Sequence, residues 1–107
     1  MVVPYSLRMA KFVVTVRFPD FFDEEFIALI PEHRHLINEL IEANVVEAYA
    51  ISANRTRGWI TMNGSSEEAI RTTVEQFPLY RFFLQVEIDE LFVFDSTASR
   101  FPRISLN

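Results

Sequence analysis

The spacing of hydrophobic residues changes along this chain, from every second residue to every third or fourth and back again. Alternation predicts a strand with one buried face, as at Phe12, Val14, Val16 and Phe18. Spacing of three and four residues predicts a helix that buries one stripe. The six predicted elements are strands at 10–18, 45–53, 57–62 and 82–89 and helices at about 21–43 and 66–77.

Polar residues and a proline mark where the first predicted helix begins, bends and ends. Asp20 or Asp23 can accept a hydrogen bond from a free amide of the first turn and so cap the helix. Asn44 stands where a residue with a left-handed backbone often ends a helix. Pro31 lacks an amide hydrogen and clashes with the carbonyl of Ile27, which predicts a kink or a restart at that point.

The order strand–helix–strand–strand–helix–strand is typical of the ferredoxin-like, split βαβ arrangement. We therefore predict an α+β fold, in which a four-stranded antiparallel sheet carries both helices on one face. One domain is expected over residues 9–95, preceded by an N-terminal arm at 1–8 and followed by a C-terminal tail at 96–107. Met1 and Met9 are both candidate start residues, because the first strand follows Met9 at once.

Composition argues against several classes of function. The 107 residues include no Cys and only two Gly, which excludes thiolate sites and glycine-rich phosphate loops. A net charge of -5 without a basic run argues against nucleic acid as a partner. No apolar stretch approaches the roughly 18 residues of a membrane span, and the N-terminus lacks the apolar region of a signal peptide. We expect a cytoplasmic protein without a membrane partner.

The second face of the predicted sheet is too apolar to stand in water. Taken by alternation alone, it carries Val13, Thr15, Arg17, Tyr49, Ile51, Trp59, Thr61, Phe83 and Gln85. A large exposed apolar patch usually marks an interface. We therefore predict a homodimer in which two chains pack sheet to sheet, as a barrel across the dimer, with strand edges or the tail as routes to a higher oligomer. The alternative is a monomer with an amphipathic open face.

Two segments, LINELIEANVVEAYAIS and RGWITMNGSSEEAIRTTVEQFPLYRFFLQVEIDEL, carry a resemblance to a known family. The turn at 77–80 and the strand end at 86–88 match the Leu-Pro-Leu-Phe turn and the Ile-Glu-Val strand of muconolactone isomerases. The chain resembles these isomerases over roughly residues 10–92. It is also similar to the wider dimeric α/β-barrel superfamily, including YCII-like proteins. The resemblance implies a dimeric α/β barrel and a cofactor-free isomerase.

The resemblance also implies positions for site residues. In muconolactone isomerases an acidic residue of the first helix is the suspected acid/base, and its position falls on His33, beside Glu32. In YCII-like proteins a helix histidine again falls on His33, and its aspartate partner falls on Phe77. The strand Tyr and Asn that face the lactone fall on Thr56 and Gly58, whose side chains cannot make the same hydrogen bonds.

Helical geometry separates the two histidines of the chain. His33 lies three residues after Ile30 and four before Ile37, on the apolar stripe of the first helix. His35 lies about 200° around the helix from His33, at a step of ~100° per residue, and should face solvent. A buried imidazole needs hydrogen bonds, and its pKa moves away from about 6.5, which suits proton transfer. His33 is therefore the candidate acid/base, and the alternative is a core histidine bonded to a backbone carbonyl or to a strand side chain such as Tyr49.

The other candidate site residues each have a functional and a structural interpretation. Glu32 is either a second acid/base or a solvated helix residue. Arg17, Arg57 and Tyr49 can bind a substrate carboxylate, since arginine offers two parallel donors. The arginines can instead form salt bridges in the dimer interface. Trp59 is either a substrate contact or a part of the core or interface.

Functions of different classes follow from these residues and the resemblance. The first is a cofactor-free isomerase that moves a proton on a small unsaturated lactone or carboxylated metabolite, with His33 as acid/base. The second is a non-catalytic module of the same fold that binds a small molecule or assists assembly, and a cofactor-free oxygenase is a further alternative. No metal site is predicted, because two histidines at i and i+2 point to opposite sides of a helix. An open cavity that reaches His33 would favour the isomerase.

Overall fold

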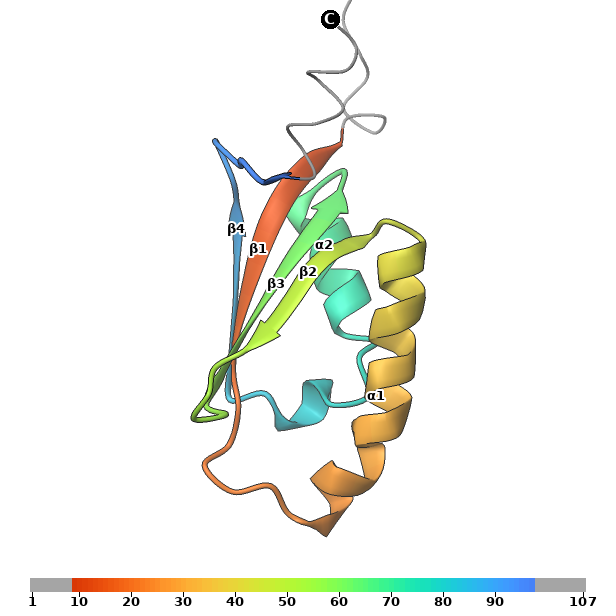
Figure 1. Cartoon of the computed structure of the whole chain (residues 1–107), viewed down its shortest axis with the longest axis vertical. Helices are drawn as coiled ribbons and strands as arrows, with labels where there is room; N and C mark the ends of the chain where they lie inside the picture. Colours follow the sequence, from red (N-terminus) through yellow and green to blue (C-terminus); the bar gives the residue numbers. More distant parts are fainter. Residues whose placement is uncertain (1–8, 98–107) are drawn as a thin grey trace, which may run out of the picture.

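Four antiparallel strands form one sheet in the order β2-β3-β1-β4, and both helices cover the same face of it (Figure 1). The computed structural model describes residues 9–97, so the predicted arm at 1–8 and residues 98–107 of the predicted tail lie outside the described residues. The elements are β1 (Ala10–Arg17), α1 (Glu24–Glu42), β2 (Val46–Ile51), β3 (Arg57–Gly64), α2 (Glu67–Val74), a turn of 3-10 helix (Tyr80–Phe82) and β4 (Gln85–Glu90).

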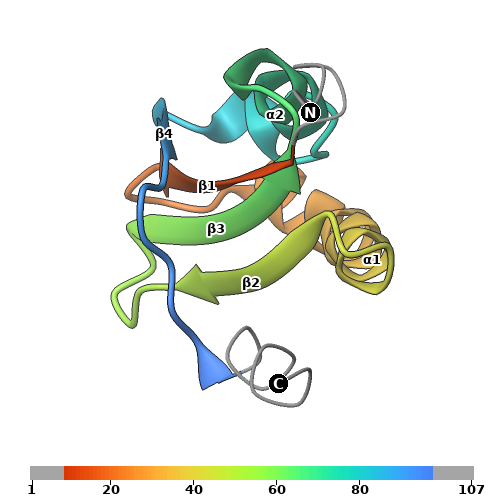
Figure 2. The same ribbon diagram turned by 90° about the horizontal axis from the view of Figure 1, so that it is seen from above.

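This arrangement confirms the predicted ferredoxin-like α+β fold. β1 and β2 are joined through α1 and lie on either side of β3, and β3 and β4 are joined through α2 and lie on either side of β1. α1 packs against β2, whereas α2 packs against β3 and β4 (Figure 2). Within residues 9–97, neither helix combines the length and the apolar character that crossing a bilayer requires.

Local side chains set the ends of α1. Asp23, rather than Asp20, caps the helix, because the amide of Phe26 donates to Asp23 Oδ1 at 2.9 Å. Asn44 follows the last turn with φ 63°, a left-handed conformation that asparagine tolerates well. The predicted role of Asn44 at the helix end is therefore confirmed.

Pro31 lies inside α1 without ending it. The residues from Glu24 to Glu42 form one helix, so the predicted restart does not occur. Pro31 cannot donate to the carbonyl of Ile27, but Ile27 is exposed, so water can replace the missing donor. One unbroken helix therefore presents its buried stripe, which includes His33, to the sheet.

A β-bulge at Glu47 decides which residues of β2 face the helices. The register of β2 against β3 skips Glu47: Val46↔Met62, Ala48↔Thr61, Tyr49↔Ile60, Ala50↔Trp59 and Ile51↔Gly58. Tyr49 and Ile51 therefore lie on the helix-covered face, where Tyr49 packs against the core and Ile51 lines a cavity. Their prediction for the open face is wrong, because one extra residue inverts the alternation of every residue that follows.

Phe82 and Phe83 both pack on the helix-covered face. The ring of Phe82 lies 5.3 Å from that of Phe26, and the ring of Phe83 lies 5.6 Å from that of Phe18. Alternation predicts Phe83 for the open face, and therefore its neighbour Phe82 for the covered face. That prediction is wrong because β4 begins only at Gln85 and the preceding residues form a turn, in which a period of two does not apply.

The face that the helices leave open is therefore less apolar than predicted. Its centre consists of Val13, Thr15, Ala48, Ala50, Trp59 and Thr61. The segment after β4 runs back across the end of the sheet (Figure 2), where the ring of Phe94 lies 4.5 Å from Lys11 Nζ. Lys11 also forms an ion pair with Glu47, the bulge residue. Because of the bulge, Glu47 lies on the open face and Tyr49 lies on the helix-covered face.

Candidate functional site

A cavity of about 160 Å³ lies between α1 and the helix-covered face of the sheet. Part of its wall is a pair of stacked rings, Phe22 and Phe26, whose centroids are 4.0 Å apart. The apolar lining residues are Phe18, Phe22, Phe26, Ile30, Ile51 and Leu79. The polar lining residues are His33, Arg34, Tyr49 and Arg55. An apolar hollow with a few placed polar groups is the usual form of a small-molecule site.

His33 supplies a buried polar group to the wall of this cavity. Its side chain is 1 % exposed, and its Nε2 lies 2.9 Å from the hydroxyl oxygen of Tyr49 on β2. The rings of Phe77 and Phe83 pack edge-on against the imidazole, with centroids at 5.5 and 6.5 Å. Nδ1 has no hydrogen-bond partner among the described residues. An unsatisfied buried nitrogen is uncommon in a purely structural core residue.

Both members of this pair are neutral at pH 7, and burial disfavours the charged form of each. It lowers the pKa of His33 from 6.5 to about 4, and the positive charge of Arg34 acts in the same direction. It also raises the pKa of Tyr49 to about 12, partly offset by Arg34. The cavity therefore presents an uncharged imidazole and an uncharged phenol, each able to take part in hydrogen bonds without a charge to desolvate.

The hydrogen in the His33–Tyr49 bond can reside on either atom, because a neutral imidazole has one donor and one acceptor nitrogen. When Nε2 carries the hydrogen and donates to the phenol oxygen, the Tyr49 hydroxyl is left to donate to a molecule in the cavity. When Tyr49 donates to Nε2, the phenol oxygen can accept a hydrogen from that molecule instead. The pair can thus pass one proton in either direction between a bound molecule and the imidazole.

Phe77 occupies the position at which the resemblance to YCII-like proteins implies an aspartate. This position does lie against His33, since the two rings meet edge-on at 5.5 Å. A phenyl ring cannot accept a conventional hydrogen bond from the imidazole. Among the described residues, no carboxylate is hydrogen-bonded to His33, so its basicity depends on burial and on Arg34 rather than on an acidic partner.

Several sequence candidates lie outside the cavity. Glu32 is exposed on α1 and does not line it. Thr56, in the β2–β3 turn, and Gly58, on β3, do not line it either. His35 faces solvent, where its Nε2 lies 3.7 Å from the carboxylate of Glu39. The predicted contrast between a buried His33 and an exposed His35 is confirmed.

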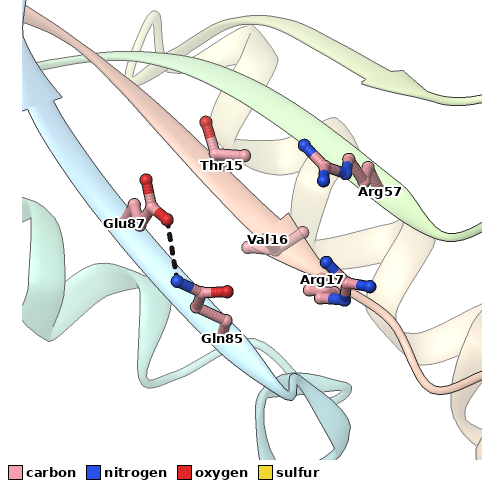
Figure 3. A pocket seen from close by; sticks show the side chains of 6 residues that line it. All are labelled: Thr15, Val16, Arg17, Arg57, Gln85 and Glu87. Carbon is pink, nitrogen blue, oxygen red and sulfur yellow. Dashed lines mark hydrogen bonds between the residues drawn. The ribbon is translucent and has the colours of Figure 1, made fainter.

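The predicted carboxylate-binding arginines lie on the wrong face for a site beside His33. Arg17 and Arg57 are direct partners on β1 and β3, and their side chains share the open face of the sheet (Figure 3). Trp59 lies next to them on the same face, 40 % exposed. The sheet separates all three residues from the cavity, so within one chain they cannot contact the molecule that contacts His33. Tyr49 is the one predicted binding residue that the structure brings to His33.

Two arginines that the sequence analysis did not single out line the cavity instead. Arg34 follows His33 on α1 and sits at the edge of the buried stripe, which its sequence position could have indicated. Arg55 belongs to the turn between β2 and β3. No sequence pattern indicates that Arg55 lies beside α1, so only the fold reveals its place.

Comparison with protein-family models finds no match, and comparison with curated proteins finds none that is significantly similar. Within residues 9–97, no group of three or more His, Asp or Glu side chains is placed to hold a metal ion. Function is therefore inferred from the cavity and its side chains.

Proposed function

We propose that this chain is a muconolactone isomerase-like protein that moves a proton, without a cofactor, on a small unsaturated lactone or a related carboxylated metabolite. The observation that carries the proposal is the His33–Tyr49 pair, held at 2.9 Å in the wall of a largely apolar cavity that two arginines also line. An acid/base pair facing a largely apolar hollow suits proton transfer next to a carbonyl.

Proton transfer would use both members of the pair. The phenol oxygen of Tyr49 takes a proton from the carbon next to the substrate carbonyl, as the hydroxyl hydrogen passes to Nε2 of His33. The electrons of the broken C–H bond form a dienolate, whose charge lies largely on the carbonyl oxygen. Return of the proton along the same route, to the carbon at the other end of the dienolate, moves the double bond and completes the isomerisation.

The low basicity of His33 sets a condition on this chemistry. With a pKa of about 4, protonation of His33 at pH 7 is uphill by about 4 kcal/mol. A negative charge on the substrate near Arg34 would cancel the influence of that guanidinium and so raise the pKa of His33, although burial, the larger cause, would still hold it below 6.5. An anionic substrate would thus make His33 a somewhat stronger base.

A second function of a different class is favoured by the same low basicity. A non-catalytic binding module would use Tyr49 to hold a carbonyl or hydroxyl group and would need no strong base. Among the described residues, no carboxylate lines the cavity, so the structure offers no second acid/base to assist His33. Binding without turnover is the property that separates this module from the isomerase.

The deciding experiment measures conversion of muconolactone and a panel of unsaturated lactones by ultraviolet absorbance. Wild type, His33→Ala and Tyr49→Phe would be compared, with His35→Ala as the matched exposed control. Turnover that both cavity variants lose and the control keeps would support the isomerase. Binding of a lactone without conversion would favour the module, and neither binding nor conversion would reject both proposals for this cavity.

We also propose that two chains pair through the open face of the sheet. The support is its central strip of small residues around Trp59, with basic side chains at one end and acidic side chains along β4. Glu87, whose carboxylate accepts a hydrogen bond from Gln85 at 2.8 Å, belongs to that acidic edge (Figure 3). Light scattering should give a dimer mass that Trp59→Glu abolishes and Phe21→Glu, at an exposed aromatic elsewhere, preserves. A monomer mass for the wild type would contradict this pairing.

A further inference from the structure

The cavity beneath α1 carries two positive charges and no compensating negative charge. Arg34 and Arg55 both line it, and among the described residues neither guanidinium forms an ion pair. Among the described residues, Arg71 lies 3.5 Å from the carboxylate of Glu67 and Arg81 contacts Glu25. Within residues 9–97, Arg17 and Arg57 form no ion pair either, but they lie on the open face of the sheet and not at this cavity. Two unpaired guanidinium groups at one apolar hollow form an anion-binding arrangement.

Arg55 belongs, through its backbone, to a hydrogen-bonded turn. Its backbone has φ 64°, in the left-handed region that glycine adopts without strain and arginine does not. The turn is tied by Asn54, whose Oδ1 accepts from Ser52 Oγ at 2.8 Å, Thr56 N at 3.1 Å and Thr56 Oγ1 at 2.8 Å. A strained residue that its surroundings fix in this way is a common feature of ligand contacts.

Arg55 also stands where the cavity meets the surface. It lines the inner cavity and, together with Phe22 and Ile30, a larger open groove of about 740 Å³. The other residues along this groove are Asp20, Phe21, Ile27, Ala53, Asn54 and Thr56. A molecule that enters through the groove would therefore pass Arg55 and place its innermost part near Tyr49.

The volume of the cavity limits what it can hold. At about 160 Å³ it is close to the ~150 Å³ apolar cavity that accommodates a benzene molecule in another protein. The stacked rings of Phe22 and Phe26 suit a flat, apolar body of that size. The Tyr49 hydroxyl and the guanidinium groups of Arg34 and Arg55 favour a ligand with polar atoms over a hydrocarbon.

We propose that the ligand of this cavity is a monocarboxylate with one apolar ring, whose body lies against Phe22 and Phe26 and whose carboxylate is bound by Arg34 and Arg55. An oxygen at the far side of the ring would meet the hydroxyl of Tyr49. This inference rests on the proposed function and specifies its substrate class. It moves the carboxylate contact from the open face of the sheet, where Arg17 and Arg57 lie, to the mouth of the cavity.

The test compares three probes of similar size on the full chain: benzoate, its neutral isostere benzamide, and phenol. Affinities would be measured by calorimetry at pH 7, and the site would be located by chemical-shift changes at Tyr49. The wild type should bind benzoate about tenfold more tightly than benzamide. Arg34→Gln and Arg55→Gln should each remove this preference while retaining phenol, and Arg57→Gln, on the open face, should leave it unchanged.

Each alternative result has a distinct meaning. Equal affinity for benzoate and benzamide in the wild type, with phenol bound beside Tyr49, would overturn the carboxylate contact and leave the cavity as a ligand site. A loss of benzoate preference in Arg57→Gln as large as in Arg34→Gln would also overturn it, because net charge rather than these two residues would be responsible. Failure of all three probes to bind would overturn this inference, whereas the proposed function would be rejected only if the lactone panel also showed neither binding nor conversion.

Discussion

Each face of the sheet carries a close pair of polar side chains, but the surroundings of the two pairs differ. On the helix-covered face, His33 and Tyr49 are hydrogen-bonded in a largely apolar wall, and burial is the main cause that moves both pKa values far from their usual range. On the open face, Arg17 and Arg57 are direct partners on neighbouring strands and both are exposed. Water and salt weaken interactions of the second pair, whereas the first pair has little solvent to weaken it. Burial, not residue type, thus makes one pair a candidate site.

The largest difference between the faces should appear in stability. Ile60→Ala removes a fully buried side chain of β3 and should cost about 2–5 kcal/mol in the free energy of unfolding. Thr61→Ala, at the next residue and on the open face, should cost about 1 kcal/mol or less. Urea unfolding measures both. Comparable losses would mean that the open face is covered as well as the core, as in a tightly paired dimer.

Acid should destabilise the fold through His33. The unfolded chain takes up a proton on this residue below pH 6.5, but the folded chain does so only near pH 4. The contribution of His33 is therefore fully present above pH 6.5 and decreases as the pH falls toward 4, by about 3 kcal/mol in total.

Urea unfolding between pH 7 and pH 4 checks this slope. His33→Gln should remove the pH-dependent part, whereas His35→Gln, on the exposed side of α1, should keep the wild-type profile. A profile that His33→Gln does not change would show that the imidazole takes up its proton equally well in both states, and would weaken the assignment of His33 to a dry cavity wall.

Removal of the Tyr49 hydroxyl should lower the free energy of unfolding by a smaller amount. Tyr49→Phe leaves Nε2 of His33 without a partner and should cost about 1–3 kcal/mol. Tyr80→Phe is the matched control, because the Tyr80 side chain packs against the core and its hydroxyl forms no hydrogen bond among residues 9–97. Thermal unfolding of the two variants gives the comparison. An equal and small change in both would mean that the His33–Tyr49 bond contributes little to folding.

The smallest change in the free energy of unfolding is expected for a substitution on the open face. Arg57→Gln removes a like charge opposite Arg17 and should stabilise the monomer by about 0.2–1 kcal/mol at low ionic strength. High salt should abolish the gain by screening. Arg71→Gln, which breaks an ion pair with Glu67, should instead lose a few tenths of a kcal/mol, on the order of other helix pairs. A loss of stability in Arg57→Gln would indicate that the acidic edge of a partner chain already neutralises Arg17 and Arg57.

Much of the fold, and the burial of His33, could be predicted from local patterns. The strands, both helices, the Asn44 helix end and the burial of His33 follow from spacings of two, three and four residues within one element. Tyr49 was named as one possible partner of His33, yet alternation placed it on the other face. Arg34 and Arg55 were not singled out, because being unpaired is a property of the surrounding structure and not of a sequence pattern.

By itself, the sequence determined the order of the elements, the fold class and which histidine is buried, because these depend on contacts between residues close together in the chain. Tertiary structure decided that Tyr49 meets His33, because the bulge at Glu47 inverts the faces of β2 and sends Glu47 itself toward Lys11, 36 residues away. It also decided that the cavity mouth carries Arg55, which a strained turn brings to α1. A single extra residue costs little locally, so only the packing of distant strands selects where it lies.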